Sequence, residues 1–180
     1  MAYNNFTLSK VKTDFSLTTK ENEDLFAGVI PIPASQLLSS ILKEQMPLAV
    51  AINTEKARSE LVIMPVLMEV RRLLHNQISI FSGSNFEVDP SQRLEGRCDF
   101  ILSRSLEQYY ISSPVLTIVE AKNESISGGL GQCIATMIVT QLFNQREGND
   151  VEIIYGVVTT GTDWKFLKLV NKTAFIDIND

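Results

Sequence analysis

The stretch Pro114-Val115-Leu116-Thr117-Ile118-Val119-Glu120-Ala121-Lys122 decides the predicted fold, because it is an apolar run that ends in two opposite charges. Most of its residues before Glu120 are aliphatic or β-branched, which is typical of a strand buried on both faces of a sheet. Side chains at positions i and i+2 of a strand point to the same face. Glu120 and Lys122 should therefore lie side by side where the strand ends, either as a structural ion pair or as the metal ligand and catalytic cation of a hydrolytic site.

A second strand is predicted at residues 97–102, shortly before this stretch. The segment between the two strands is too short for a helical crossover but long enough for a wide hairpin. An antiparallel hairpin centred near Tyr109 and Tyr110 would bring Asp99 next to Glu120, at roughly 5 Å. Two carboxylates at that separation repel each other unless a cation lies between them, and oxygen ligands suit Mg²⁺ or Mn²⁺. The hairpin therefore predicts a metal site, with a plain buried ion-pair cluster as the alternative.

The remaining sequence predicts helices and further strands around this hairpin. Helical periodicity appears at residues 35–47, 54–75 and 128–148, where Pro47 should end the first helix and Pro65 should kink the second. Strand patterns appear at residues 78–81, 86–88, 94–102, 151–160, 164–170 and 174–178, with a Gly83-Ser84-Asn85 turn between the first two. Residues 6–19 alternate loosely and predict one or two peripheral strands or a hairpin. This order of elements predicts an α/β fold with a mixed sheet flanked by helices.

Composition limits the classes of function that fit. The 180 residues suit a single domain, and the formal net charge of −5 argues against a protein that coats nucleic acid through clustered Lys and Arg. It does not exclude a nucleic-acid enzyme, because metal-binding carboxylates are themselves negative. Cys98 and Cys133 lack zinc-site spacing and are predicted to be buried small hydrophobes in a reducing compartment. The absence of a long apolar run or a signal-like start predicts a cytoplasmic protein without a membrane partner.

The acidic residues and the motif lysine carry a resemblance to a known family. Asp99 followed by Glu120-Ala121-Lys122, with Glu60 on the preceding helix and Gln132 on the following helix, resembles the PD-(D/E)XK nuclease superfamily. The resemblance covers residues 54–169 and implies the restriction-endonuclease-like fold. It implies one nuclease-like domain over residues 1–180, in which residues 1–53 form an N-terminal extension of strands and a helix, and residues 54–170 form the nuclease core.

The same resemblance implies the roles of the site residues. It implies metal ligands at four positions: Glu60, Asp99, Glu120 and the main-chain carbonyl of Ala121. It implies that Lys122 activates the attacking water and steadies the phosphate, and that Gln132 contributes to the site. In the superfamily a proline precedes the motif aspartate, but other residues are tolerated at this position. Cys98 occupies it in this sequence. Asp89 is a competing carboxylate, but Pro90 and the turn-like residues after it make Asp89 a predicted loop residue and favour Asp99.

The resemblance implies a Mg²⁺-dependent endonuclease, a hydrolase that cuts DNA phosphodiester bonds through in-line attack of a metal-activated water. The alternative is a non-catalytic nuclease-fold binding or scaffold subunit of a defence or mobile-element system, which would have a protein partner. Cutting both strands needs two sites, so a nuclease of this kind favours a homodimer. Five arginines could contact DNA phosphates or could simply be solvated: Arg71, Arg72, Arg93, Arg97 and Arg104.

Overall fold

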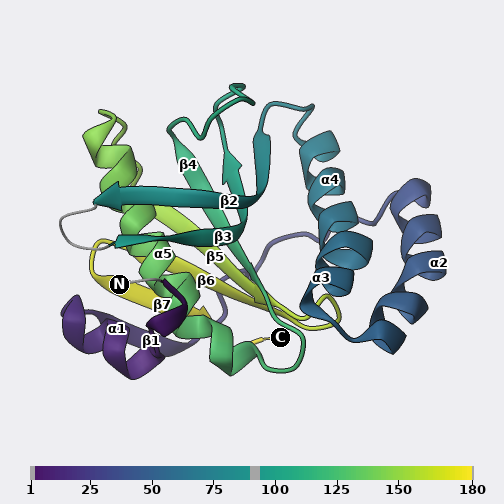
Figure 1. Cartoon of the computed structure of the whole chain (residues 1–180), viewed down its shortest axis with the longest axis horizontal. Helices are drawn as coiled ribbons and strands as arrows, with labels where there is room; N and C mark the ends of the chain where they lie inside the picture. The colour runs from purple at the N-terminus through teal and green to yellow at the C-terminus, as the bar shows by residue number, and fades with distance from the viewer. Residues whose placement is uncertain (1–2, 90–93, 180) are drawn as a thin grey trace.

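The computed structural model describes residues 3–89 and 94–179, which form one seven-stranded mixed sheet with helices on both faces (Figure 1). The strand order across the sheet is β1-β7-β6-β5-β4-β3-β2. This architecture confirms the predicted α/β class with a mixed sheet flanked by helices. The single-domain boundaries and the cytoplasmic location stay predictions.

The centre of the sheet is built from three antiparallel strands and one parallel crossover. The antiparallel strands are β2 (Ser79–Asp89), β3 (Leu94–Ser103) and β4 (Val115–Ala121). Helix α5 (Ile126–Arg146) then leads to β5 (Ile153–Thr159), which pairs with β4 in parallel, as a helical crossover allows. Strands β6 (Trp164–Val170) and β7 (Thr173–Asp177) continue the sheet by antiparallel pairing.

Strand β2 differs from its prediction, because it runs unbroken through the expected turn at Gly83-Ser84-Asn85. The ladder to β3 continues on both sides of Gly83, since Ser82 pairs with Phe100 and Ser84 pairs with Cys98. Gly83 has a φ of +61°, a conformation that glycine adopts without steric cost. The glycine therefore lies within a continuous strand instead of forming a turn.

Apolar side chains pack on both faces of the sheet. The larger cluster lies between α5 and the sheet and includes Ile118, Ile134 and Met137, all fully buried. The smaller cluster packs Ile63 and Leu67 against Val119 and other strand residues on the opposite face. Among the described residues, α5 is the one helix long and apolar enough to cross a membrane, but half of its most apolar window is buried within the fold. Burial of that extent is typical of the core helix of a globular domain.

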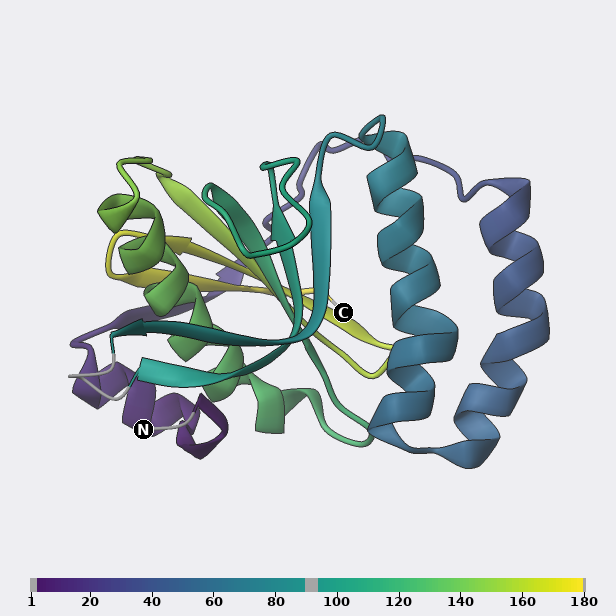
Figure 2. The same ribbon diagram turned by 45° about the horizontal axis from the view of Figure 1, so that its top comes forward.

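The helices before β2 form a pair that stands beside the sheet, with α2 on the side away from it (Figure 2). Helix α2 spans Gln36–Ile52, so the prediction that Pro47 ends this helix was wrong. The helix ends instead at Asn53, which adopts the left-handed conformation with a φ of 53°. Proline removes only one main-chain donor, and the rest of the helix keeps its hydrogen bonds around it.

The second helical segment consists of α3 (Glu55–Arg58), the π-helical turn η2 (Ser59–Ile63) and α4 (Met64–Leu73). The Thr54 side chain caps α3 by accepting a hydrogen bond from the Ala57 amide at 3.1 Å. The π turn lies just before Pro65, where the sequence predicts a kink. Such a turn widens the helix by one residue and changes which side chains face the sheet.

The N-terminal segment was predicted as strands but is largely helical. Its elements are η1 (Tyr3–Asn5), α1 (Leu8–Asp14) and β1 (Thr18–Glu23). Thr7 caps α1 by accepting from the Lys10 amide at 3.2 Å, which favours a helix over a strand there. Helix α1 packs on α5, where a Cβ added at Gly131 would lie 2.3 Å from the Phe6 carbonyl oxygen. Strand β1 pairs in parallel with β7, so this segment is part of the main sheet.

Candidate functional site

The candidate site forms where β3 and β4 separate. The ladder between β3 and β4 ends at the pair Phe100 and Val119. The next positions in the same register are Asp99 on β3 and Glu120 on β4. Beyond this point the Ala121 amide donates to Asp99 Oδ2 at 2.8 Å instead of to a strand partner. The separation leaves room for both carboxyl groups at the carboxyl end of β4. Asp99 and Glu120 thus lie next to each other as the predicted hairpin requires.

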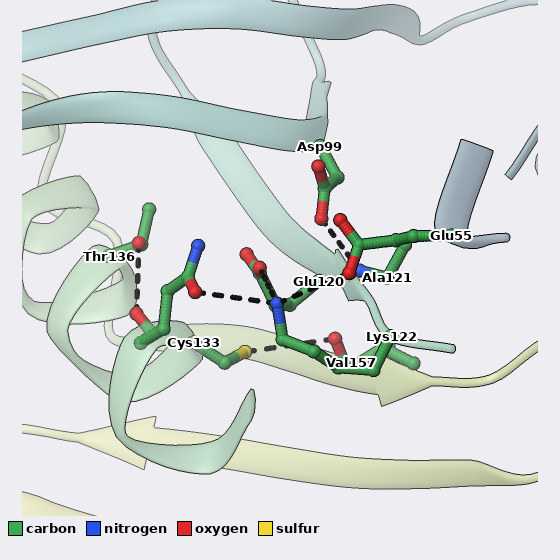
Figure 3. A network of polar contacts seen from close by, with 9 residues as sticks. Glu55, Asp99, Glu120, Ala121, Lys122, Cys133, Thr136 and Val157 are labelled. Carbon is green, nitrogen blue, oxygen red and sulfur yellow. Dashed lines mark hydrogen bonds and ion pairs between the residues drawn. The ribbon is translucent and has the colours of Figure 1, made fainter. Parts of the chain in front are cut away.

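Lys122 is the centre of the polar network at this end of the sheet (Figure 3). Its ammonium donates to Glu120 Oε1 at 2.6 Å and to Gln132 Oε1 at 3.4 Å. The same nitrogen lies 3.9 Å from Glu55 Oε2. Strand β4 supplies Glu120, Lys122 follows directly after this strand, α5 supplies Gln132, and α3 supplies Glu55. Side chains from α3, from the end of β4 and from α5 therefore converge on one cation.

Burial differs sharply across the network and controls its electrostatics. The Glu120 side chain is only 2% exposed, and burial raises the pKa of this carboxyl to about 8, with repulsion from Asp99 adding to the effect and Lys122 opposing it. Burial alone would lower the pKa of Lys122, but the carboxylates of Glu120, Glu55 and Asp99 outweigh it and raise the pKa. Lys122 therefore stays protonated at neutral pH. Glu120 takes up a proton much more readily than an ordinary glutamate.

The donor atoms at the site fit a hard divalent cation. Its oxygen donors are the carboxyl groups of Glu55, Asp99 and Glu120 and the side-chain amide oxygen of Gln132. Mg²⁺ and Mn²⁺ prefer such oxygen ligands. Burial and the neighbouring Asp99 carboxylate both raise the pKa of Glu120, so an added cation would stabilise its ionised form. Within residues 3–89 and 94–179, no three His, Cys, Asp or Glu side chains already form a metal-binding group.

Glu60, which the resemblance implies as a metal ligand, does not join this network. Its carboxylate pairs with Lys56 at 2.9 Å, and its side chain is 61% exposed. Glu55, one residue after the Thr54 cap, lies at the site instead. Burial raises the pKa of Glu55, Lys122 opposes this, and Asp99 adds to it, which places Glu55 in the same electrostatic cluster. Sequence reasoning missed Glu55, although its position in the first helical turn after a cap was a usable signal.

The other expected residues lie as follows. Gln132 contacts Lys122, and Ala121 lies between Glu120 and Lys122, with its side chain fully buried. Cys98 and Cys133 are both buried, which confirms the sequence prediction. Asp89, predicted in a loop, is the last residue of β2 and pairs with Leu94, whereas Asp99 is the carboxylate opposite Glu120.

Two hollows open at the site and share a wall. The inner pocket, of about 250 Å³, is lined by Glu55, Asp99, Glu120, Lys122 and Gln132 among others. The outer groove, of about 420 Å³, extends from there along α3 and β2 and includes Lys56, Glu60, Ser82 and Gly83. Glu55, Arg97 and Asp99 line both hollows, so together they form a path from the solvent to the carboxylates.

No protein-family model, curated protein or solved structure gives a significant match to the chain. The function must therefore be inferred from the geometry and charge of this site. The arrangement offers carboxylates for a divalent cation, and a protonated lysine beside them.

Proposed function

We propose that this protein is a Mg²⁺- or Mn²⁺-dependent DNA endonuclease with a restriction-endonuclease-like fold. The observation that carries the proposal is the convergence of Asp99, Glu120 and Lys122 at the separated ends of β3 and β4. The order of elements also supports it, because helix α4, the antiparallel strands β2 to β4, helix α5 and strand β5 follow one another as the resemblance to PD-(D/E)XK nucleases implies. The polar, open character of the inner pocket suits a charged backbone substrate.

Asp99, Glu120, Glu55 and the Ala121 carbonyl would hold the divalent ion. The ion would supply Lewis acidity, which lowers the pKa of water and offsets charge on the phosphate. Lys122 is protonated at neutral pH and can donate a hydrogen bond to a phosphate oxygen as charge develops there. Gln132 orients the lysine through its amide oxygen, 3.4 Å from the ammonium. The buried carboxylate of Glu120 keeps the ammonium at the base of the pocket.

The proposal is tested by incubating purified protein with supercoiled plasmid and linear duplex DNA, in Mg²⁺, in Mn²⁺ and in EDTA. We expect cleavage with either metal and none in EDTA. Asp99→Asn and Lys122→Met should each reduce the cleavage rate by roughly 100-fold or more, the usual effect of removing one transition-state interaction. Glu124→Gln and Lys172→Met are matched controls, because both residues are exposed and lie outside the site.

The controls should cut at the wild-type rate. Cleavage that persists equally in wild type, Asp99→Asn and Lys122→Met would come from a contaminating nuclease, and the proposed activity would then be wrong. Circular dichroism of each variant should match wild type, so that loss of activity is not loss of fold.

The second candidate is a non-catalytic scaffold that keeps the fold. The observation that favours it is the 2.6 Å pair between Lys122 and Glu120, which neutralises the buried carboxylate without any metal. A scaffold of this kind would bind no Mn²⁺ in calorimetric titration and would cut no DNA. Saturable Mn²⁺ binding that Asp99→Asn abolishes would exclude it.

A further inference from the structure

Arg97 lies on the wall shared by the inner pocket and the outer groove. It is two residues before Asp99 on β3, and its side chain is exposed. A ligand that extended from the carboxylates into the outer groove would therefore pass the guanidinium. None of the roles derived above for the site uses this residue.

The other two cations that line these hollows are already paired. Lys122 is held by Glu120 at 2.6 Å, and Lys56 is held by Glu60 at 2.9 Å. None of the ion pairs among the described residues includes Arg97. Arg97 can therefore offer its donors to a ligand without first breaking a contact with a carboxylate.

Gly83 on the neighbouring strand makes room for this guanidinium. A Cβ added at Gly83 would lie 2.6 Å from one terminal nitrogen of Arg97, which is closer than such atoms approach. The φ of +61° at Gly83 is a further reason why another residue is disfavoured there. The strand thus has a glycine at a position where the arginine side chain lies against its backbone.

We propose that Arg97 binds a backbone phosphate of the DNA strand in the outer groove, next to the phosphate that is cut, and so fixes the strand in the site. The guanidinium presents a fork of donors that matches two phosphate oxygens. The same groove is also lined by the acidic residues Glu55, Glu60 and Asp99. A cation at this place is needed to hold a polyanion against them. The inference deepens the proposed nuclease function and rests on it for the identity of the substrate.

The first test measures binding of a fluorescein-labelled DNA duplex by anisotropy, in Ca²⁺, at several salt concentrations. Ca²⁺ takes the same oxygen ligands with looser geometry than Mg²⁺, and a gel establishes that the DNA stays intact. We expect Arg97→Gln to weaken binding roughly tenfold and to reduce the slope of log affinity against log salt by about one, as loss of one phosphate contact does. Arg97→Lys should keep the slope but recover only part of the affinity, because it keeps the charge and loses the fork.

Arg104→Gln is the matched control. The sequence left open a phosphate contact by Arg104 as well, but this residue follows the end of the same strand, is exposed, and lines neither hollow. It should bind DNA with wild-type affinity and salt slope. Equal losses in Arg97→Gln and Arg104→Gln would overturn the inference, because they would show a general effect of net charge.

Gly83→Ala provides an independent variant that leaves the arginine in place. It should displace the guanidinium and weaken DNA binding in the same direction as Arg97→Gln. The double variant should bind no more weakly than Arg97→Gln alone, because the two changes remove the same contact. Additive losses would contradict the inference. Thermal unfolding of each variant separates these effects from loss of fold.

Steady-state cleavage in Mg²⁺ distinguishes a substrate-binding role from a structural one. Arg97→Gln should raise KM roughly tenfold with kcat nearly unchanged, because the contact exists before and during the reaction. If the wild type cuts DNA but Arg97→Gln changes neither KM nor affinity, only the role of Arg97 is wrong. If DNA binding depends on Arg97 but no cleavage occurs, the role of Arg97 stands and the nuclease proposal fails. If the wild type neither binds nor cuts DNA, both are wrong.

Discussion

Glu55 and Glu60 are close in sequence but differ in environment, so they form a matched pair for testing the site. Glu55 lies 3.9 Å from Lys122, whereas Glu60 pairs with the exposed Lys56. We expect Glu55→Gln to weaken Mn²⁺ binding and to slow DNA cleavage, each roughly tenfold, because it removes one charged oxygen from the site. Glu60→Gln should change both by less than about twofold. Calorimetry with Mn²⁺ and the plasmid assay measure the two effects.

If Glu60→Gln weakened Mn²⁺ binding and cleavage more than Glu55→Gln does, Glu60 would be favoured as the metal ligand, as the resemblance implies. It would also mean that the π turn at η2 rearranges when metal binds, because Glu60 would have to leave Lys56.

Glu120 makes the stability of the metal-free protein depend on pH. Its folded-state pKa of about 8 lies above the ordinary value of 4.5, so the folded protein holds this proton more tightly than the unfolded chain does. The contribution to stability is therefore complete below pH 4.5 and is lost as pH rises toward 8, with a magnitude on the order of a few kcal/mol. Urea unfolding in EDTA at pH 5, 7 and 9 should show this decline in the wild type.

Glu120→Gln should flatten the decline, because glutamine carries no charge at any of these pH values. The exposed residue Glu124 provides the control, and Glu124→Gln should follow the wild-type curve. If wild type and Glu120→Gln lose stability in parallel as pH rises, another group is responsible.

Three of the site residues could be predicted because strand geometry is simple. Alternation along a strand places Glu120 and Lys122 on one face, and antiparallel pairing places Asp99 beside them. The choice between Glu55 and Glu60 could not be made this way. It depends on how the helix meets the end of the sheet and on the π turn, which neither periodicity nor the resemblance specifies.

At the scale of elements, Arg58 joins the helical pair to the sheet. Its guanidinium donates to the Thr160 carbonyl at 2.7 Å and to Asn53 Oδ1 at 3.0 and 3.2 Å, and the residue is only 9% exposed. Arg58→Met should lower the free energy of unfolding by about 2–3 kcal/mol, because the partner oxygens lose their charged donor. Urea denaturation measures this change.

Lys56→Met is the comparison for that experiment, since the Lys56 side chain is 82% exposed and its ion pair with Glu60 is on the surface. It should change stability by less than about 0.5 kcal/mol. Similar losses in the two variants would show that Arg58 does not anchor the helices.

The elements that were predicted wrongly share a physical cause. Pro47 lacks one donor and was expected to end α2, yet neighbouring turns and packing against η2 and α4 retain the helix. Helix α1 was not predicted, because Phe6 and Leu8 alternate as the apolar residues of a strand do. The Thr7 cap and the contacts of α1 with α5 favour a helix there. Tertiary contacts outweigh local propensity in both places. The strands of the core could be predicted because long apolar runs are typical of buried strands.

For the whole molecule, a divalent cation should raise the melting temperature. A ligand that binds only the folded protein at 100 times its Kd stabilises it by about 2.7 kcal/mol, which for a domain of this size corresponds to roughly 5–10 °C. Differential scanning fluorimetry in Mg²⁺ or Mn²⁺ should show this shift in the wild type and not in Asp99→Asn. Na⁺ at equal ionic strength should have little effect. An equal shift in both proteins would show that the cation binds elsewhere.

The α/β class could be predicted from the order of helices and strands, but the complete sheet could not. Alternation and apolar runs identify strands individually, whereas the partner of an edge strand depends on distant residues. The pairing of β1 with β7 is such a case, because no local pattern in residues 18–23 indicates β7 as the neighbour.

That pairing also has a consequence for the order of folding. Strand β1 is made early by the ribosome, but its neighbour β7 follows only after almost all of the described chain has been synthesised. Contacts between such distant residues require closure of a very long loop and form slowly. Strands β2 to β5 with α5 can assemble first from nearer segments, which completes the end of the sheet that carries Asp99 and Glu120. The edge formed by β1 should therefore close last, and until then β7 presents an unpaired edge to other chains.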